Sequence, residues 1–329
     1  SVTDVLDGFL TRIDSVNPKL NAIVTRCDDI ARQQAKAMDQ DFSPGSKPLY
    51  GLPIAIKDLA LTKGLRTTLG SPIFENFVPV EDDLFVERLR QAGAFIIGKT
   101  NTREFGAGSQ TFNQVLGATR NPSDLDKTCG GSSGGAAVAV ASGMLPFADG
   151  SDLGGSLRNP AAFCNVVGFR PSPGRVPNWP KQLSSDPLSV TGPMARNVED
   201  VALLLSVMAG PDPRVPISID QPGEIFTQSL ARDWKDTRIA FSKDLGLFEV
   251  ESEIADSIEN ALPIFSDLNV VVEQASPNLK SAQEVFTTLR AWLFASRLGG
   301  LLEEHRNRMK DTVIWNIEQG LKLTLADVT

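Results

Sequence analysis

Along the first two thirds of the chain, helical and extended patterns of apolar residues alternate. The helical spacing of four apolar residues predicts an amphipathic helix over residues 2–16: Leu6, Phe9, Leu10 and Ile13. Similar patterns predict helices at 28–40, 83–93, 134–143 and about 197–210. Short apolar runs predict strands at 20–26, 49–58 and 94–100. Because strands alternate with helices, we expect an α/β fold in which helices flank a mixed β-sheet core.

The remaining third repeats this alternation after two proline-rich stretches. Residues 171–180 and 210–224 contain several prolines each and are predicted to be loops. Apolar β-branched runs predict strands at 236–244 and 269–276, and residues 283–323 have a largely helical pattern.

Composition and charge narrow the class of protein. The chain has 329 residues, 41% of them hydrophobic and 22% charged, which is typical of a globular protein with a large core. A net charge of −8 argues against a surface for nucleic acid or anionic membrane. Three widely spaced cysteines favour a reducing compartment, so we expect a cytoplasmic protein. We find no secretory signal and no apolar run of the roughly 18 residues that a membrane span needs.

The single histidine restricts the chemistry. Any metal site or Ser-His-Asp mechanism has to use His305, which lies in the charged stretch LLEEHRNRMK and is interpreted as part of a solvated helix face. We therefore expect neither a metal nor another cofactor.

Residues 129–135, CGGSSGG, place two serines among four glycines. A phosphate-binding loop would need a lysine after the last glycine, and none follows. The segment fits G-x-S-x-G with Ser133 as nucleophile, but that motif needs a preceding buried strand, and residues 121–130 are polar and turn-rich. Ser132 and Ser133 could also cap the helix predicted at 134.

A second glycine-serine loop, GSDLGGSLRNP at 150–160, offers another interpretation. Its glycines precede Ser156 and would leave consecutive backbone N–H groups free to stabilise an oxyanion when Ser156 attacks a carbonyl. The base then has to be a residue other than histidine. Lys57, which ends the apolar run GLPIAIK, is the candidate.

Together these motifs resemble the amidase signature family. The resemblance rests on GGSSGG, the loop GSDLGGSLRNPAA, and six further motifs in order: GLPIAIKD (51–58), TTLGS (67–71), GAFIIGKTNTREFG (93–106), GATRNP (117–122), VVGFRPSPGRVP (166–177) and GPMAR (192–196). It covers residues 1 to about 215 closely and the remainder loosely. It implies one amidase signature domain over 1–329, with core motifs at 50–200 and the C-terminal part of the usual domain short or missing.

The resemblance also implies a Ser-Ser-Lys triad. Ser156 corresponds to the nucleophile, Ser132 to the bridging serine that follows a cis peptide bond, and Lys57 to the base. Residues 153–156 correspond to the oxyanion-hole amides, which gives Leu153, Gly154 and Gly155 a binding role beside Ser156. Ser133, Asp152 and Arg158 match positions that brace the site. For Arg158, recognition of a substrate carboxylate is the alternative.

Chemistry at neutral pH requires Lys57 to be uncharged. At its ordinary pKa about one lysine in 2,500 is neutral at pH 7, a cost of roughly 4.6 kcal/mol. Burial can remove most of that cost, and the run Pro53–Ile56 supplies an apolar setting. Asp58 would oppose this, but neighbouring side chains on a strand point to opposite faces.

We therefore expect an amidohydrolase that acts on a small-molecule amide through a Ser156 acyl-enzyme. The first alternative is the glutamine-hydrolysing subunit of a tRNA-dependent amidotransferase, which needs partner subunits. The second is a catalytically inactive, amidase-like binding protein. No direct nucleic-acid or membrane partner is expected, and a homodimer is one option for assembly.

Overall fold

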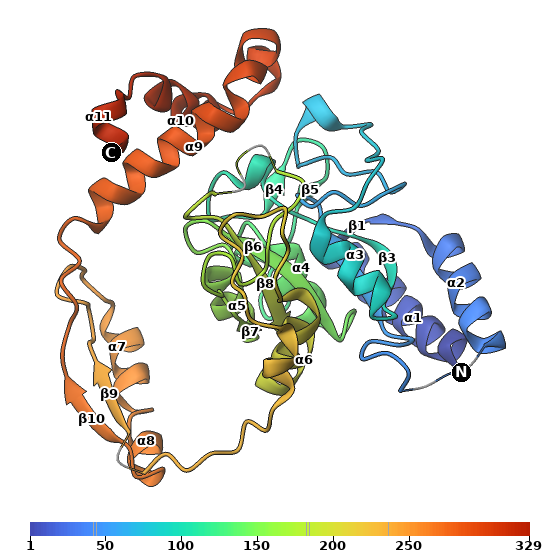
Figure 1. The fold of residues 1–329 in the computed structure, drawn as a ribbon, viewed down its shortest axis with the longest axis horizontal. Coiled ribbons are helices and arrows are strands. Elements are labelled where there is room, and N and C mark those ends of the chain that lie inside the picture. Colours follow the sequence, from blue (N-terminus) through green and yellow to red (C-terminus); the bar gives the residue numbers. More distant parts are fainter. Residues whose placement is uncertain (42, 44, 182, 184, 236) are drawn as a thin grey trace. The chain divides into compact units, whose positions relative to one another are not determined.

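The computed structural model describes residues 1–41, 43, 45–181, 183, 185–235 and 237–329. These form two compact units, Ser1–Gln228 with Ala291–Lys322 and Ser229–Arg290 with Leu323–Thr329 (Figure 1). That both units belong to one family domain stays a prediction.

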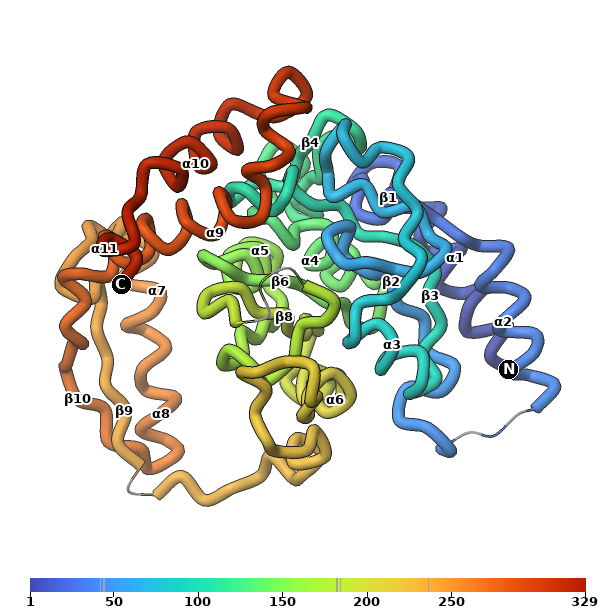
Figure 2. The backbone as a smooth tube through the Cα atoms, turned by 45° about the horizontal axis from the view of Figure 1, so that its top comes forward, coloured from blue at the N-terminus to red at the C-terminus, as the bar shows by residue number. Residues whose placement is uncertain are grey.

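The larger unit begins with two helices that pack side by side, α1 (Val2–Leu20) and α2 (Asp28–Gln40) (Figure 2). Both were predicted, although α1 runs four residues beyond the predicted end. It ends where Asn21 adopts a left-handed conformation. Nearby, the Asn17 amide oxygen accepts hydrogen bonds from the N–H groups of Ala22 and Ile23.

The first sheet has the order β1-β3-β2, with bounds Ile23–Arg26, Phe95–Thr100 and Pro53–Lys57. Strand β2 is parallel to β3, whereas β1 is antiparallel to it, so the sheet is mixed. Helix α3 (Leu84–Gln91) leads into β3, as the sequence predicts. The predicted strand 49–58 starts too early, because Gly51 has φ +77° in a turn and extended structure begins only at Pro53.

The second sheet is antiparallel, with the order β6-β8-β7 and bounds Phe147–Asp152, Val190–Ala195 and Val167–Gly168. The sequence analysis missed these strands and treated 150–160 as a loop throughout. Glycine, proline and aspartate hide the extended pattern in FADGSD and VTGPMA. Gly192 is needed where β8 passes under another backbone, since a Cβ there would lie 2.3 Å from the Phe169 carbonyl oxygen.

Helix α4 (Gly134–Ala141) fills the core beside β6 and β8 (Figure 1). Its small residues let it approach the end of β3 closely. A Cβ on Gly135 would lie only 2.3 Å from the Asn101 backbone nitrogen. Every residue of the helix from Gly134 to Val140 is consequently buried.

Three further helices complete this unit: α5 (Arg158–Cys164), which the sequence analysis did not predict, α6 (Val198–Met208) and α10 (Asp311–Leu321). Helix α9 (Ala282–His305) enters it at Ala291. Together α9 and α10 form an apolar cluster with the segment around Phe105: Ala107, Phe294, Leu302, Met309, Val313 and Ile317. A short hairpin consists of β4 (Phe112–Asn113) and β5 (Gly117–Ala118).

The smaller unit contains a two-stranded parallel sheet, β9 (Arg238–Phe241) with β10 (Val271–Gln274). The sequence predicts both strands, but position 236, where the first was expected to begin, lies outside the described residues. Three helices accompany the sheet: α7 (Ser252–Glu259), α8 (Pro263–Asp267) and α11 (Leu325–Val328). Among the helices described here, none combines the length and apolar character that crossing a membrane requires.

Candidate active site

Lys57 is fully buried at the end of β2 and points at three serine hydroxyls. Its Nζ lies 2.8 Å from Ser132 Oγ, 2.7 Å from Ser133 Oγ and 2.9 Å from Ser151 Oγ. Two of these serines precede α4, and the third lies on β6. Three segments that are distant in sequence therefore meet at one amine.

The serine pair enters this site through a tightly held loop. The Gly131–Ser132 peptide bond is cis, as the family resemblance implies. Thr111 Oγ1 donates to the Gly130 carbonyl at 2.9 Å and accepts the Gly134 N–H at 3.0 Å. Thr111 thus serves the start of α4, whereas the Ser133 side chain makes no capping hydrogen bond. Ser133 instead faces Lys57.

The hydrogen bonds around Ser133 define which way protons point. Its hydroxyl donates to the Ser151 carbonyl at 3.3 Å and accepts the Ser151 N–H at 3.2 Å. Because its only hydrogen is used, Ser133 can only accept from Lys57 Nζ. A neutral amine also has one lone pair, and the hydroxyl of Ser132, 2.8 Å away, is placed to donate to it.

The electrostatics match this arrangement. Burial lowers the pKa of Lys57 to about 7, against the carboxylates of Asp149 and Asp152, which favour the charged form. About half of the lysine is then neutral near pH 7, instead of about one part in 2,500. Asp58 does not oppose this, because its carboxylate faces the other way and accepts the Thr68 N–H at 3.1 Å.

Asp152 organises the loop that carries Ser156. Its carboxylate accepts the N–H groups of Gly155 at 2.7 Å and Leu157 at 3.1 Å. Arg158 donates to both carboxylate oxygens at 3.0 Å, and Arg170 Nε lies 3.4 Å from Oδ1. Burial alone would raise the pKa of Asp152, but these donors together lower it. Arg158 therefore lies as a brace on Asp152.

This loop leaves backbone donors available. Among the described residues, the N–H groups of Leu153, Gly154 and Ser156 donate no hydrogen bond, whereas the N–H of Gly155 is occupied by Asp152. Three of the four predicted oxyanion-hole amides are thus free to bind a carbonyl oxygen.

Ser156 is half-buried and lies beside the serine pair, since its carbonyl accepts the Ser133 N–H at 3.3 Å. Within the part of the chain that is described, its hydroxyl makes no hydrogen bond. The predicted bond between the hydroxyls of Ser156 and Ser132 is therefore not formed here. Catalytic hydrogen bonds often tighten only when a substrate binds, so this link stays a prediction.

His305 ends α9, where its Nε2 lies 3.7 Å from Glu304 Oε2. The described residues contain no group of three or more His, Cys, Asp or Glu side chains that could hold a metal ion.

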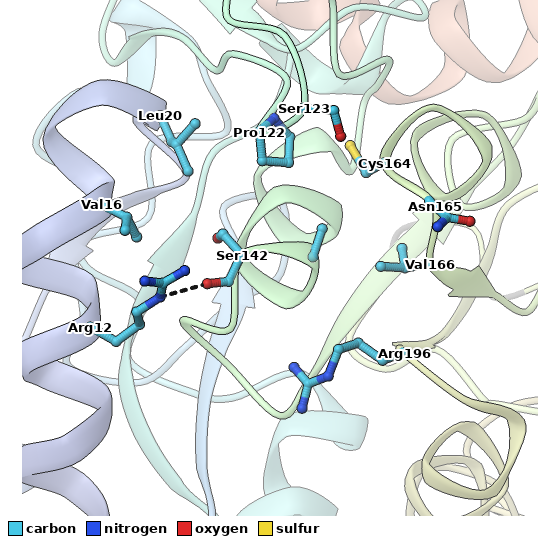
Figure 3. A pocket seen from close by; sticks show the side chains of 11 residues that line it. Arg12, Val16, Leu20, Pro122, Ser123, Ser142, Cys164, Asn165, Val166 and Arg196 are labelled. Carbon is cyan, nitrogen blue, oxygen red and sulfur yellow. Dashed lines mark hydrogen bonds between the residues drawn. The ribbon is translucent and has the colours of Figure 1, made fainter.

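A hollow of about 420 Å³ lies at the other end of α4 and contains none of the predicted site residues (Figure 3). Two arginines in its wall bind carbonyl oxygens at this helix end. Arg12 Nε donates to Ser142 at 2.8 Å, and Arg196 Nη1 donates to Val140 and Leu145 at 3.2 Å. The visible role of both arginines is to cap the C-terminal end of α4.

Sequence reasoning missed Asp149, Ser151 and Thr111 as parts of the site. Ser151 was regarded only as a mild variation of a family position. The one local signal was Asp149, an acidic residue next to the apolar run Leu145–Ala148. Such a residue is expensive to bury and points to a specific partner.

The buried lysine, the serine pair and the glycine-rich loop on a mixed α/β scaffold define the class of serine-containing hydrolase folds that the motifs indicated. The chain belongs to the family described as Amidase, whose model matches residues 4–323.

Comparison with individual proteins agrees. A subunit of the glutamyl-tRNA(Gln) amidotransferase from Sulfurihydrogenibium sp. (strain YO3AOP1) is 42% identical over 86% of this chain and 59% of its own length. A bacterial aryl acylamidase structure covers all of this chain and 71% of its own, with 30% identity and a TM-score of 0.92. For 6-aminohexanoate cyclic dimer hydrolase with bound substrate, the values are 100%, 70%, 27% and 0.89. The chain thus spans about three fifths of the length of the curated relative.

Proposed function

We propose that this protein is an amidohydrolase that cleaves a C–N amide bond through an acyl-enzyme on Ser156. The observation that carries the proposal is the fully buried Lys57 amine, which lies 2.8 Å from the Ser132 hydroxyl and has a pKa lowered by burial to about 7. A neutral amine in that position can accept a proton from Ser132.

The proposed cycle needs no group beyond the chain, the amide and water. Ser132 passes its proton to Lys57 and takes the proton of Ser156, whose Oγ forms a bond to the amide carbonyl carbon. The free N–H groups of residues 153, 154 and 156 stabilise the oxyanion. The C–N bond breaks as the proton returns through Ser132 to the leaving nitrogen. Water then attacks the ester by the reverse route and releases the carboxylate.

The surroundings of the serine pair favour amides with apolar substituents. A Cβ on Gly106 would lie 3.5 Å from Ser132 Oγ, so this segment adjoins the reacting hydroxyls. On either side of it, Phe105 and Ala107 pack into the apolar cluster of α9 and α10. Burial of an aryl or alkyl group against such a wall is favourable by roughly 25 cal/mol per Å².

The second candidate is a glutamine-hydrolysing amidotransferase subunit, favoured by the 42% identity to a protein of that kind. That function would need partner subunits and groups that bind the glutamine carboxylate. The brace between Arg158 and Asp152 supports a structural role for this arginine and leaves the carboxylate site without an assigned residue. A panel of aryl amides, aliphatic amides and glutamine separates the two candidates by their relative kcat/KM.

A fluorophosphonate labelling assay tests the nucleophile. We expect the wild-type protein and the control variant His305→Ala to become labelled, and Ser156→Ala to remain unlabelled. Labelling of Ser156→Ala would contradict the proposal. Loss of labelling in His305→Ala would instead favour the histidine-dependent mechanism with Ser133. No labelling of the wild-type protein would favour an inactive binding protein.

A further inference from the structure

One face of β6 lies along the whole of Lys57. Asp149 and Ser151 are two residues apart on this strand and so point to the same face. Asp149 Oδ1 accepts the Lys57 backbone N–H at 2.9 Å, and Ser151 Oγ lies 2.9 Å from Lys57 Nζ. The strand therefore binds the lysine at both its main chain and its amine.

The Asp149 bond joins the two three-stranded sheets. Lys57 belongs to β2 of the first sheet, and Asp149 to β6 of the second. Asp149 is 1% exposed, so the hydrogen bond forms in a dry environment where an unpaired carboxylate would be costly. A side chain thus supplies the link between the sheets at the residue that the proposed mechanism depends on.

The charged groups around Lys57 come from three elements. Strand β6 contributes Asp149 and Asp152, and the paired strand β3 contributes Lys99, whose Nζ donates to the Ala60 carbonyl at 2.6 Å. Asp58, next to Lys57 in sequence, is bound to Thr68. The segment before α4 presents only the hydroxyls of its serine pair.

We propose that Asp149 is a positioning residue that fixes the Lys57 main chain and supplies the buried negative charge that sets the lysine's protonation. This inference rests on the proposed function. Burial raises the pKa of Asp149 to about 6, which leaves the carboxylate ionised when Lys57 titrates near 7. Its charge then favours the ammonium form and keeps the neutral amine a stronger base than burial alone would.

The substitution Asp149→Asn separates the two roles. The asparagine amide oxygen can still accept the Lys57 N–H, but the negative charge is gone. Because that charge favours protonated Lys57, its removal lowers the lysine pKa. We expect the acid limb of the fluorophosphonate labelling rate to move about one unit toward lower pH. The plateau rate should fall severalfold, since an amine of lower pKa is a weaker base.

Asp58→Asn is the matched control, because it removes a neighbouring buried carboxylate that faces away from Lys57. Its acid limb should remain where the wild-type limb lies. An unchanged limb in Asp149→Asn, or an equal shift in Asp58→Asn, would overturn the inference. Failure of the proposed function is a separate result, because the wild-type protein would then not be labelled at all.

If Asp149→Asn does not fold, the double variant Asp149→Asn, Lys57→Met decides. Removal of the cation leaves no charge for the carboxylate to face, so the double variant should recover a cooperative unfolding transition. If it also fails to fold, Asp149 has a general core role and the inference is wrong.

Discussion

Two lysines are fully buried on neighbouring strands, and their surroundings differ in one respect that matters for chemistry. Lys57 on β2 contacts three hydroxyls at 2.7–2.9 Å. Lys99 on β3 contacts the Ala60 carbonyl at 2.6 Å and the Thr62 hydroxyl at 2.8 Å. Burial lowers the pKa of Lys57 to about 7 and that of Lys99 to about 8.

Hydrogen-bond partners distinguish these two lysines better than burial does. A carbonyl can only accept, so the partner of Lys99 is best served by an ammonium. A hydroxyl can either accept or donate, so the partners of Lys57 suit the charged and the neutral amine alike. The first lysine can therefore cycle between protonation states without leaving a partner unsatisfied, whereas the second is held as a structural cation.

The largest test of this contrast replaces each lysine by methionine. Lys57→Met removes the general base, and kcat/KM should fall by about 10²–10⁴-fold. Lys99→Met leaves the Ala60 carbonyl without its donor, and the free energy of unfolding should fall by about 1–3 kcal/mol. In the folded fraction of Lys99→Met, kcat/KM should stay within about tenfold of wild type. Equal losses of activity in both variants would break the contrast.

The pH profile gives the next largest effect. Lys57 must be neutral to act, and a lowered pKa of about 7 means that the active form is lost as the pH falls below that value. We expect kcat/KM to drop about tenfold per pH unit on the acid side and to level off above about pH 8. Measurement between about pH 5 and pH 9 locates the limb. A limb near the ordinary lysine pKa of about 10 would show that Lys57 is not the group that titrates.

The smallest effects come from removing one hydroxyl beside each lysine. Ser151→Ala should lower kcat/KM by about 2–10-fold, equivalent to one net hydrogen bond of about 0.5–1.5 kcal/mol. Thr62→Val should lower the free energy of unfolding by a similar amount and leave kcat/KM unchanged. Denaturant titration and steady-state kinetics on both variants separate the outcomes. An activity loss confined to Thr62→Val would reverse the roles that we assign to the two sites.

The apolar spacing of the sequence was sufficient for several elements. Helix 28–40 appears as predicted, and the helix and strand within 83–100 are confirmed within two residues at each end. These segments have strong local patterns of period 3.6 or uninterrupted apolar runs. The strands β6 and β8 were missed because glycine, proline and aspartate interrupt their patterns. Part of the predicted loop at 150–160 is consequently strand.

The sequence by itself determined the family, through ordered motifs that name Lys57, Ser132 and Ser156, and it restricted the chemistry by offering a single histidine. Only the tertiary structure decided that Asp149 and Ser151 join Lys57, and that Asp152 occupies the Gly155 N–H. Residue spacing along a strand fixes which face a side chain takes. Which distant strand lies opposite that face depends on packing between segments that are separated by more than ninety residues, as Lys57 and Asp149 are.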